Sequence, residues 1–331
     1  MTLVEATAGV MWLGVVLYAL FGGADFGAGF WDLVAGNAKK GAKQRALIEH
    51  SIGPVWEANH VWLIFVLVVM WTCFPSLFGA VTSTLWIPFT LAAFGIIARG
   101  SAFAFRKVVA QVWQQRLLGA AFAFSSIVTP FFFGTIAGAV AAGHVPSGVG
   151  TGSTITSWLS PMPIMTGVLA VTICAYLAAV YLTADARRSG DKVLVEQFRN
   201  RALTAAVVAG LVAVGGLVFL HQQAPFIADG LAHRGLPFIL LSGISGLVAL
   251  GLLYIRYFAT ARIFAAVAVA AVLIGWAAAQ YPYVLPTQVT LTQAAAVTSV
   301  LKATLASMAV GALILIPSLS WLYVLFQKSE R

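Results

Sequence analysis

Residues 236–258 read LPFILLSGISGLVALGLLYIRYF, and the first twenty of them contain no charged side chain. A helix that crosses about 30 Å of hydrocarbon needs roughly 20 mostly apolar residues. Eight other stretches of the chain have a similar length and composition. The predicted membrane helices cover about 6–36, 50–72, 77–106, 117–143, 161–186, 199–221, 236–258, 261–280 and 296–326. The sequence therefore predicts an all-α, polytopic membrane protein of about nine transmembrane helices.

The composition agrees with a chain surrounded by lipid. Of the 331 residues, 61% are hydrophobic and 9% are charged, whereas soluble domains carry roughly 25% charged residues. The net charge of +9 is too thinly scattered to follow a phosphate backbone, so no nucleic-acid partner is expected. The two cysteines, Cys73 and Cys174, lie in apolar runs without zinc-ligand spacing, and no metal site is predicted.

The basic residues indicate how the chain is oriented. Loops on the cytoplasmic side of a membrane carry an excess of Lys and Arg. If the chain has nine membrane helices and its N-terminus lies outside, every Lys and Arg except Arg99, Arg234 and Lys302 falls at the inner side. Eight or ten helices would scramble this alternation. We therefore predict an external N-terminus and a cytoplasmic C-terminus.

The whole chain, 1–331, is predicted to form a single integral membrane domain. Residues 1–143 hold the first four helices and the most polar of them, and 161–280 hold the next four. The ninth helix and the tail occupy 296–331, and the largest inward loop is expected at about 186–199. No sequence repeat separates the two groups, so the pattern alone does not predict two bundles.

Three ionisable residues fall inside the predicted helices at a similar depth. At 1.5 Å per residue, Asp25 lies about 16 Å from the cytoplasmic end, and Glu57 and Arg99 each lie about 12 Å from it. Charged groups at membrane depth are costly, and they commonly mark an ion or proton path. Two neighbouring carboxyl groups tend to share a proton near neutral pH, as a relay requires. The alternative is a buried ion-pair cluster that only neutralises Arg99.

The second predicted helix is the most polar one, and its residues 50–62 read HSIGPVWEANHVW. Glu57 and His60 are neighbours at the i, i+3 spacing. Trp56 and Asn59 share an adjacent face with His60, and His50 is expected near the inner interface, where it could admit protons. His60 is open to three interpretations: a relay member, a haem ligand or a hydrogen-bonded structural histidine.

Four motifs carry a resemblance to a known family. They are GADFGAG at 23–29, GPVWEANHVWL at 53–63, Ala98-Arg99-Gly100, and YPYVLP at 281–286. Together they resemble subunit II of cytochrome bd-type and cyanide-insensitive quinol oxidases, the second motif being the longest and most specific. The match is clear over about 1–110 and 280–310, and elsewhere it rests on the number of helices.

The resemblance implies two four-helix bundles and a peripheral C-terminal helix. It also implies a partner, subunit I, that carries the haems (b and d, or b-type only) and oxidises ubiquinol or menaquinol while O2 is reduced to water. Subunit II is expected to bind no haem and to catalyse nothing alone, although it can hold a structural quinone. Small single-helix accessory subunits and a bacterial inner membrane location belong to the same expectation.

The resemblance also assigns residue roles. Glu57 would be the acid of a cytoplasmic proton route, framed by Trp56, Asn59 and Trp62, and Asp25 matches an acid of the first helix. Some family members have a second acid where this chain has Gly22. Two alternatives remain: a secondary transporter, which also places polar residues at mid-depth, and a purely structural anchor for the haem subunit.

Overall fold

The computed structural model describes residues 2–37, 39–53, 56–105, 108–109 and 111–328. Within these ranges, nine helices are long and apolar enough to cross a membrane, so the predicted number is confirmed. They are α1 (Leu3–Leu33), α3 (Trp56–Cys73), α5 (Trp86–Phe105), α6 (Val112–Ala141), α7 (Pro161–Arg188), α8 (Lys192–Gln223), α10 (Leu236–Tyr254), α11 (Phe258–Gln280) and α13 (Thr298–Lys328).

Four shorter helices and one strand pair connect these spans. The short helices are α2 (Ala42–Ile52), α4 (Pro75–Thr84), α9 (Pro225–His233) and α12 (Leu291–Ala294). Strands β1 (Tyr283–Leu285) and β2 (Val289–Thr290) pair in antiparallel fashion. The YPYVLP motif thus contains the first strand of a small hairpin before α12, which is a local exception to the predicted all-α fold.

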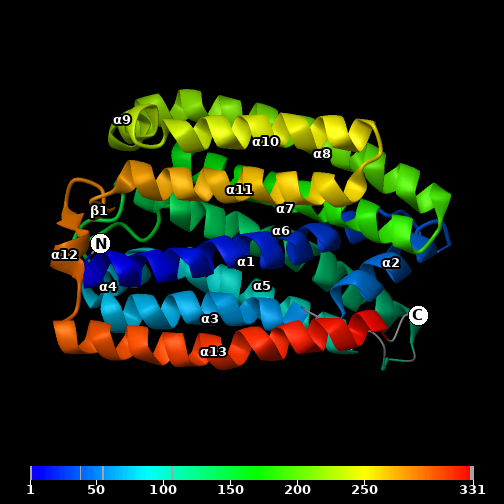
Figure 1. Ribbon diagram of the computed structural model, residues 1–331, viewed down its shortest axis with the longest axis horizontal. Coiled ribbons are helices and arrows are strands. Elements are labelled where there is room, and N and C mark those ends of the chain that lie inside the picture. The colour runs from blue at the N-terminus through cyan, green and yellow to red at the C-terminus, as the bar shows by residue number, and fades with distance from the viewer. Residues whose placement is uncertain (1, 38, 54–55, 106–107, 110, 329–331) are drawn as a thin grey trace.

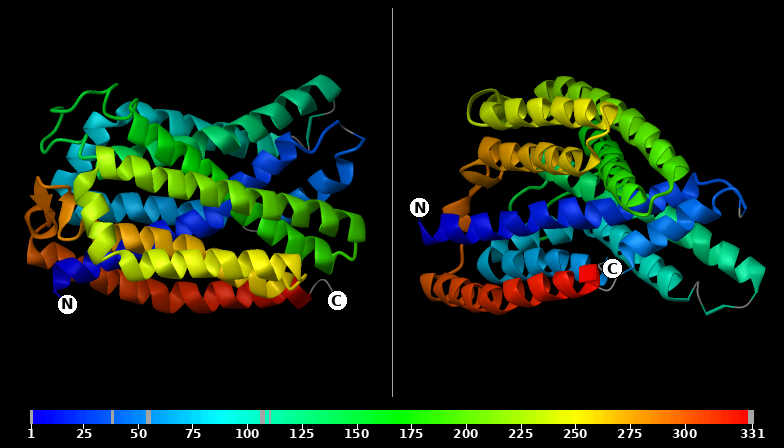
Figure 2. Two further views of the ribbon diagram at one scale, coloured as in Figure 1. Left: turned by 90° about the horizontal axis from the view of Figure 1, so that it is seen from above. Right: turned by 45° about the vertical axis from the view of Figure 1, so that its right-hand side comes forward.

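The long helices run side by side, with α1 in the middle of the molecule (Figures 1 and 2). Helix α1 packs against α3, α6 and α7, while α7 also packs against α8 and α11. Helix α13 lies along α3 at one edge, and α10 lies at the opposite edge (Figure 1). Helix α1 begins at one end of the molecule, and helix α13 ends at the other (Figure 1).

Glycine allows the central helices to approach closely. A Cβ atom placed on Gly27 of α1 would lie 1.8 Å from the backbone oxygen of Cys174 on α7. One placed on Gly29 would lie 2.1 Å from the hydroxyl of Ser126 on α6. Without a hydrophobic drive between helices in lipid, small residues that permit this contact hold membrane helices together.

Two predicted helices are each divided in the structure. The segment 50–72 is not one helix, because α2 ends at Ile52 and α3 begins at Trp56. Glycine weakens a helix, and Gly53 is the residue at the C-terminal cap of α2. Residues 54–55 lie outside the described part of the chain. The segment 77–106 divides between α4 and α5, where Pro88 cannot donate to the carbonyl one turn earlier.

The expected inward loop at 186–199 is mostly helical. Helix α7 continues to Arg188 and α8 begins at Lys192, so the turn is short. Asp191 begins α8, since its Oδ1 accepts hydrogen bonds from the N–H groups of Val193 and Leu194 at 3.0 and 3.1 Å. A side-chain cap of this kind satisfies N–H groups that have no partner within the helix.

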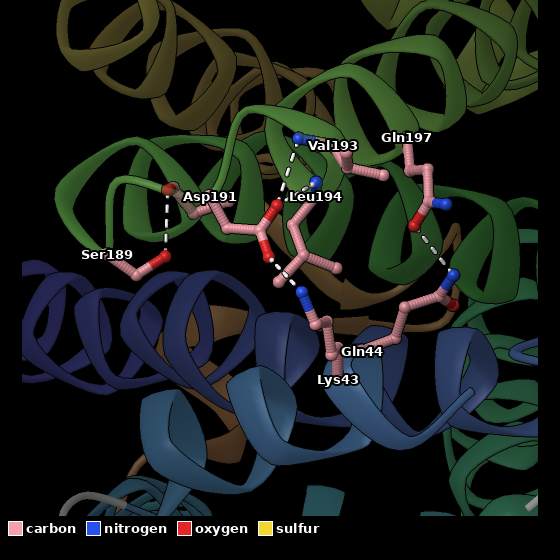
Figure 3. Close-up of polar contacts among 8 residues, drawn as sticks. Lys43, Gln44, Ser189, Asp191, Val193, Leu194 and Gln197 are labelled. Atoms are coloured by element: carbon pink, nitrogen blue, oxygen red, sulfur yellow. Dashed lines mark hydrogen bonds and ion pairs between the residues drawn. The ribbon is translucent and has the colours of Figure 1, made fainter. Parts of the chain in front are cut away.

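Polar side chains of α2 join the beginning of α8, as Figure 3 shows. Lys43 Nζ lies 3.2 Å from Asp191 Oδ2, and Gln44 donates to Gln197 Oε1 at 2.8 Å. Arg201 in turn donates to Gln44 Oε1 at 2.8 Å. These contacts connect the short helix after the first span to the beginning of the sixth span, α8.

Asp191 is expected to make the stability of this region depend on pH. Hydrogen bonds from Leu194 and Val193, together with Lys43, lower the pKa of Asp191 below its ordinary 3.8. A carboxyl group with a lowered pKa stabilises the folded state above its ordinary pKa and loses that effect as the pH falls through the folded pKa. We expect Asp191→Ala to lower the melting temperature by an amount constant from pH 7 to pH 5 and smaller below about pH 4. Thermal unfolding of both proteins across this range checks the prediction, and a difference that grows with acidity would contradict it.

Candidate functional site

Asp25 lies at the contact of α1 and α3, where its carboxylate is held by an amide. Its side chain is 6% exposed. Asn59, in the first turn of α3 and also buried, donates from Nδ2 to Asp25 Oδ2 at 2.7 Å. A buried carboxylate needs hydrogen-bond donors to offset the loss of water, and Asn59 supplies one.

Arg99 of α5 is the largest side chain among those fully buried in the described residues. Its Nη2 donates to the backbone oxygen of Asp25 at 2.9 Å, and its Nε donates to Ser126 Oγ at 3.2 Å. The guanidinium carbon lies 5.0 Å from the ring centres of both Phe26 and Phe122. Two hydrogen bonds and two cation–π contacts therefore hold the guanidinium between α1, α5 and α6.

The cluster differs from a simple ion pair. Among the described residues, Arg99 forms no ion pair within 4 Å of the Asp25 carboxylate; it contacts the backbone oxygen of that residue instead. The carboxylate thus faces the Asn59 amide, and the guanidinium faces a carbonyl, a hydroxyl and two rings. The similar depth predicted for Asp25 and Arg99 agrees with this contact.

His60 lies one turn further along α3 than Trp56 and is half-buried. Its Nδ1 is 3.5 Å from the hydroxyl of Tyr18. The rings of Tyr18, Phe26 and Trp56 surround it with centre-to-centre distances of 6.0, 5.9 and 6.3 Å. Trp56 itself packs on Phe103 of α5. His60 and Trp56 therefore border the cluster of Asp25, Asn59 and Arg99.

Glu57 does not lie where the sequence placed it. It stands in the first turn of α3 and is exposed, so its predicted position about 12 Å inside an unbroken helix is wrong. The reason is that α2 ends at Ile52 as a separate helix, so residues 50–52 do not belong to the helix that contains Glu57. Glu57 precedes Asn59 by two residues, so it lies on a different face of α3 from the side chain that contacts Asp25.

His50 and Trp62 also lie apart from the cluster. His50 is exposed near the end of α2, a separate short helix. Trp62 is half-buried on α3 and its ring packs on Phe65, at 6.3 Å between centres. His50 therefore belongs to α2 and not to the second span, and Trp62 packs on Phe65 further along α3 than Asn59.

Tyr18, Ser126 and Phe122 complete the cluster and were not predicted. Tyr18 lies two turns before Asp25 on α1, and the other two lie on α6. The sequence offered one signal for α6, the adjacent polar pair Ser125 and Ser126 in an apolar helix. Which helix approaches Arg99 depends on packing between distant segments, which no local pattern contains.

Nine apolar spans around a buried carboxylate and guanidinium define a multi-pass helical membrane protein with an ionisable core. The sequence pattern of the cytochrome bd terminal oxidase subunit II family matches residues 3–326, almost the whole chain. The chain therefore belongs to that family.

Individual relatives share a modest part of the sequence. Subunit 2 of the cytochrome bd ubiquinol oxidase of Bacillus subtilis (strain 168) is 26% identical over 64% of this chain and 60% of its own length. A putative cytochrome bd menaquinol oxidase subunit II of the same organism is 20% identical over 97% of this chain and 95% of its own length. In the solved structure of the bd oxidase from Geobacillus thermodenitrificans, one chain matches with a TM-score of 0.78 and 25% identity, over 98% of this chain and 99% of that one.

Proposed function

We propose that this chain is the non-haem subunit II of a cytochrome bd-type quinol oxidase in a bacterial inner membrane. In this assembly, subunit I binds the haems, and electrons pass from quinol to O2 to give water. The present chain supports subunit I and contributes to the delivery of cytoplasmic protons. Its N-terminus lies outside and its C-terminus in the cytoplasm, as the distribution of basic residues indicates. Membership of the family and the likeness to a solved bd oxidase support the proposal.

The observation that carries the proposal is one face of α3. Val61, Ile64, Val68 and Trp71 follow Glu57 at helical spacing, and all five side chains are exposed. Glu57 stands in the first turn of α3, so the stripe begins with a carboxylate near the end of the span and continues inward with apolar side chains. We infer that a partner subunit covers this stripe. Subunit I is the partner that membership of this family supplies.

Two acids adjoin the first turn of α3, Asp25 of α1 on one side and Glu57 on another, and this supports a role in proton transfer. Asp25 is enclosed and held by Asn59, whereas Glu57 is open toward the covered face. Carboxyl groups can take up and release protons, while the amide of Asn59 keeps the Asp25 carboxylate oriented. His60 and Trp56 border the turn, Trp62 packs further along α3, and His50 of α2 lies on the expected cytoplasmic side. In this proposal His60, Trp56, Trp62 and His50 position the groups of the proton route.

The cofactors of the oxidase belong to subunit I in this proposal. A structural quinone in the present chain stays an expectation of the family resemblance. A cavity of about 210 Å³ is lined by Ala141, Ala142, Gly143, Ala224, Pro225, Phe226, Pro286 and Thr287.

Glu57→Gln tests the proposed relay. The amide keeps the size and polarity of the side chain but cannot carry a proton. We expect oxygen consumption by the purified oxidase to fall by about 100-fold, while haem content and subunit ratio stay normal. Asp229→Asn, which alters an exposed acid on α9, is the matched control and should leave turnover unchanged.

The alternative functions give different outcomes. Normal turnover of a fully assembled Glu57→Gln oxidase would favour a purely structural anchor and refute the relay. A secondary transporter would be stable and active without a haem-bearing subunit. Purification of the tagged chain, followed by a visible spectrum, separates these cases, because a fixed ratio of haem protein to this chain excludes the transporter.

A further inference from the structure

A small cavity lies next to the ring that covers Arg99. The ring of Phe122 lies 5.0 Å from the guanidinium carbon of Arg99 and also lines this cavity, whose volume is about 20 Å³. Its lining residues are Asp32, Arg45, Ile48, Glu49, Phe103 and Phe122. They come from α1, α2, α5 and α6. The cavity thus adjoins the cluster from the side of α2.

The cavity has the size and the polar lining that one water molecule needs. A water requires at least about 10–15 Å³ and two to four polar partners. Asp32 and Glu49 contribute carboxyl groups, and Arg45 contributes a guanidinium. Arg45 Nε lies 2.7 Å from Asp32 Oδ1, although the Asp32 side chain is almost completely buried. The same guanidinium donates to the backbone oxygen of Gly36 at 2.6 Å, so it fixes Asp32 and the end of α1 together.

Asp32 is aligned with Asp25 along α1. The two residues are seven apart, which places them on one face of the helix with a rise of about 10 Å between them. Gly29 lies between them, and the hydroxyl of Ser126 occupies the space that a Cβ atom at Gly29 would need. Ser126 also accepts the hydrogen bond from Arg99 Nε. Along this face of α1, the hydroxyl of Ser126 from α6 therefore lies against Gly29, between the positions of the two acids.

From this alignment we propose that the cavity is the cytoplasmic inlet of the proton route and that Asp32 is its first acid. The inference rests on the proposed function. A hydronium ion in the cavity gives a proton to the Asp32 carboxylate and leaves a water. The Asp32 carboxyl then returns to its charged form as the proton moves on toward Asp25. Where it passes through Ser126, the hydroxyl gains one hydrogen on its oxygen and releases another, so no bond to carbon changes.

Asp32→Asn in the complete oxidase tests the inlet. The variant keeps the size of the side chain and loses the group that carries the proton. We expect turnover to fall by about tenfold or more with a normal haem spectrum. The ratio of rates in H2O and D2O should rise, because proton uptake becomes the slow step. Asp32→Glu should restore most of the rate. Asp185→Asn, which changes an acid paired with Arg262 on the same expected side, should leave both quantities unchanged.

Two further variants separate an inlet from a structural ion pair. Arg45→Gln breaks the contact with Asp32 and retains the carboxyl group. If Arg45→Gln reproduced the entire effect of Asp32→Asn, including the larger isotope ratio, the inlet would be refuted. Glu49→Gln leaves the Asp32–Arg45 pair intact. It replaces Asp32→Asn as the test of the inlet if that variant fails to assemble. It should slow turnover several-fold and raise the isotope ratio, and an unchanged ratio would overturn the inference.

The outcomes also distinguish this inference from the proposed function. Slow turnover of Glu57→Gln combined with normal turnover of Asp32→Asn would refute the inlet and leave the relay standing. Normal turnover of both variants would refute the relay, and the inlet with it.

Discussion

Gly27→Ala is expected to prevent the close packing of α1 on α7 and to abolish assembly of the oxidase. The added Cβ atom would lie 1.8 Å from the carbonyl oxygen and 2.3 Å from the carbonyl carbon of Cys174. These are backbone atoms of a long helix and cannot turn aside as a side chain could. Overpacking in a core costs about 1–3 kcal/mol and occasionally more, and we expect the upper end because α1 contacts α7 at the centre of the fold.

The result is measured as the amount of haem-containing complex recovered from membranes and as its melting temperature. Gly9→Ala is the matched control, since it makes the same substitution in the same helix where nothing lies within 4 Å of the new atom. It should assemble normally. If Gly27→Ala assembled as well as Gly9→Ala and melted at the same temperature, the close contact between α1 and α7 would be wrong.

The number of spans could be predicted from the sequence because each span is a local signal. Twenty apolar residues in one stretch suffice, whatever the neighbouring helices do. Even the narrow gap between the seventh and eighth spans is present, where α10 ends at Tyr254 and α11 begins at Phe258. Arg256 adopts a positive φ of 68° within that turn.

The breaks within polar or proline-containing segments were harder to predict. Gly53, Pro54 and Pro88 were visible, but membrane helices tolerate glycine and proline where neighbours satisfy the freed backbone groups. Whether such a residue bends a helix or divides it depends on those neighbours. This is why the segment 50–72 was predicted as one helix and why Glu57 was placed too deep.

Only part of the candidate site could be predicted, because the sequence indicates depth along a helix and does not indicate which side faces a neighbour. Depth along each helix follows from residue number, so the common level of Asp25 and Arg99 could be predicted. Rotation about the helix axis was not fixed, and rotation decides that Asn59 faces Asp25 while Glu57 faces outward. The partners of Arg99 on α6 required knowledge of which helices touch.

Arg99→Met is expected to destabilise the subunit strongly, and Asp25→Asn is expected to recover part of that loss. Arg99 and Asp25 share one enclosed cluster, although the hydrogen bond between them uses the Asp25 backbone oxygen. Removing one charge from a buried group of opposite charges costs about 3–5 kcal/mol, because the remaining charge lacks compensation. Methionine also loses the hydrogen bond to Ser126, although it still fills much of the space between Phe26 and Phe122.

A double-mutant cycle separates charge balance from packing. The variants are Arg99→Met, Asp25→Asn and the two combined, each measured by thermal unfolding of the purified complex. If the charges are coupled, the double variant should be more stable than Arg99→Met alone, since neither uncompensated charge remains. Asn at position 25 can still accept the hydrogen bond from Asn59 through its own oxygen, so that contact is retained. Strictly additive losses of stability would show that Arg99 acts through packing and hydrogen bonds alone. The charge of Arg99 would then have no effect on the stability cost of the Asp25 carboxylate.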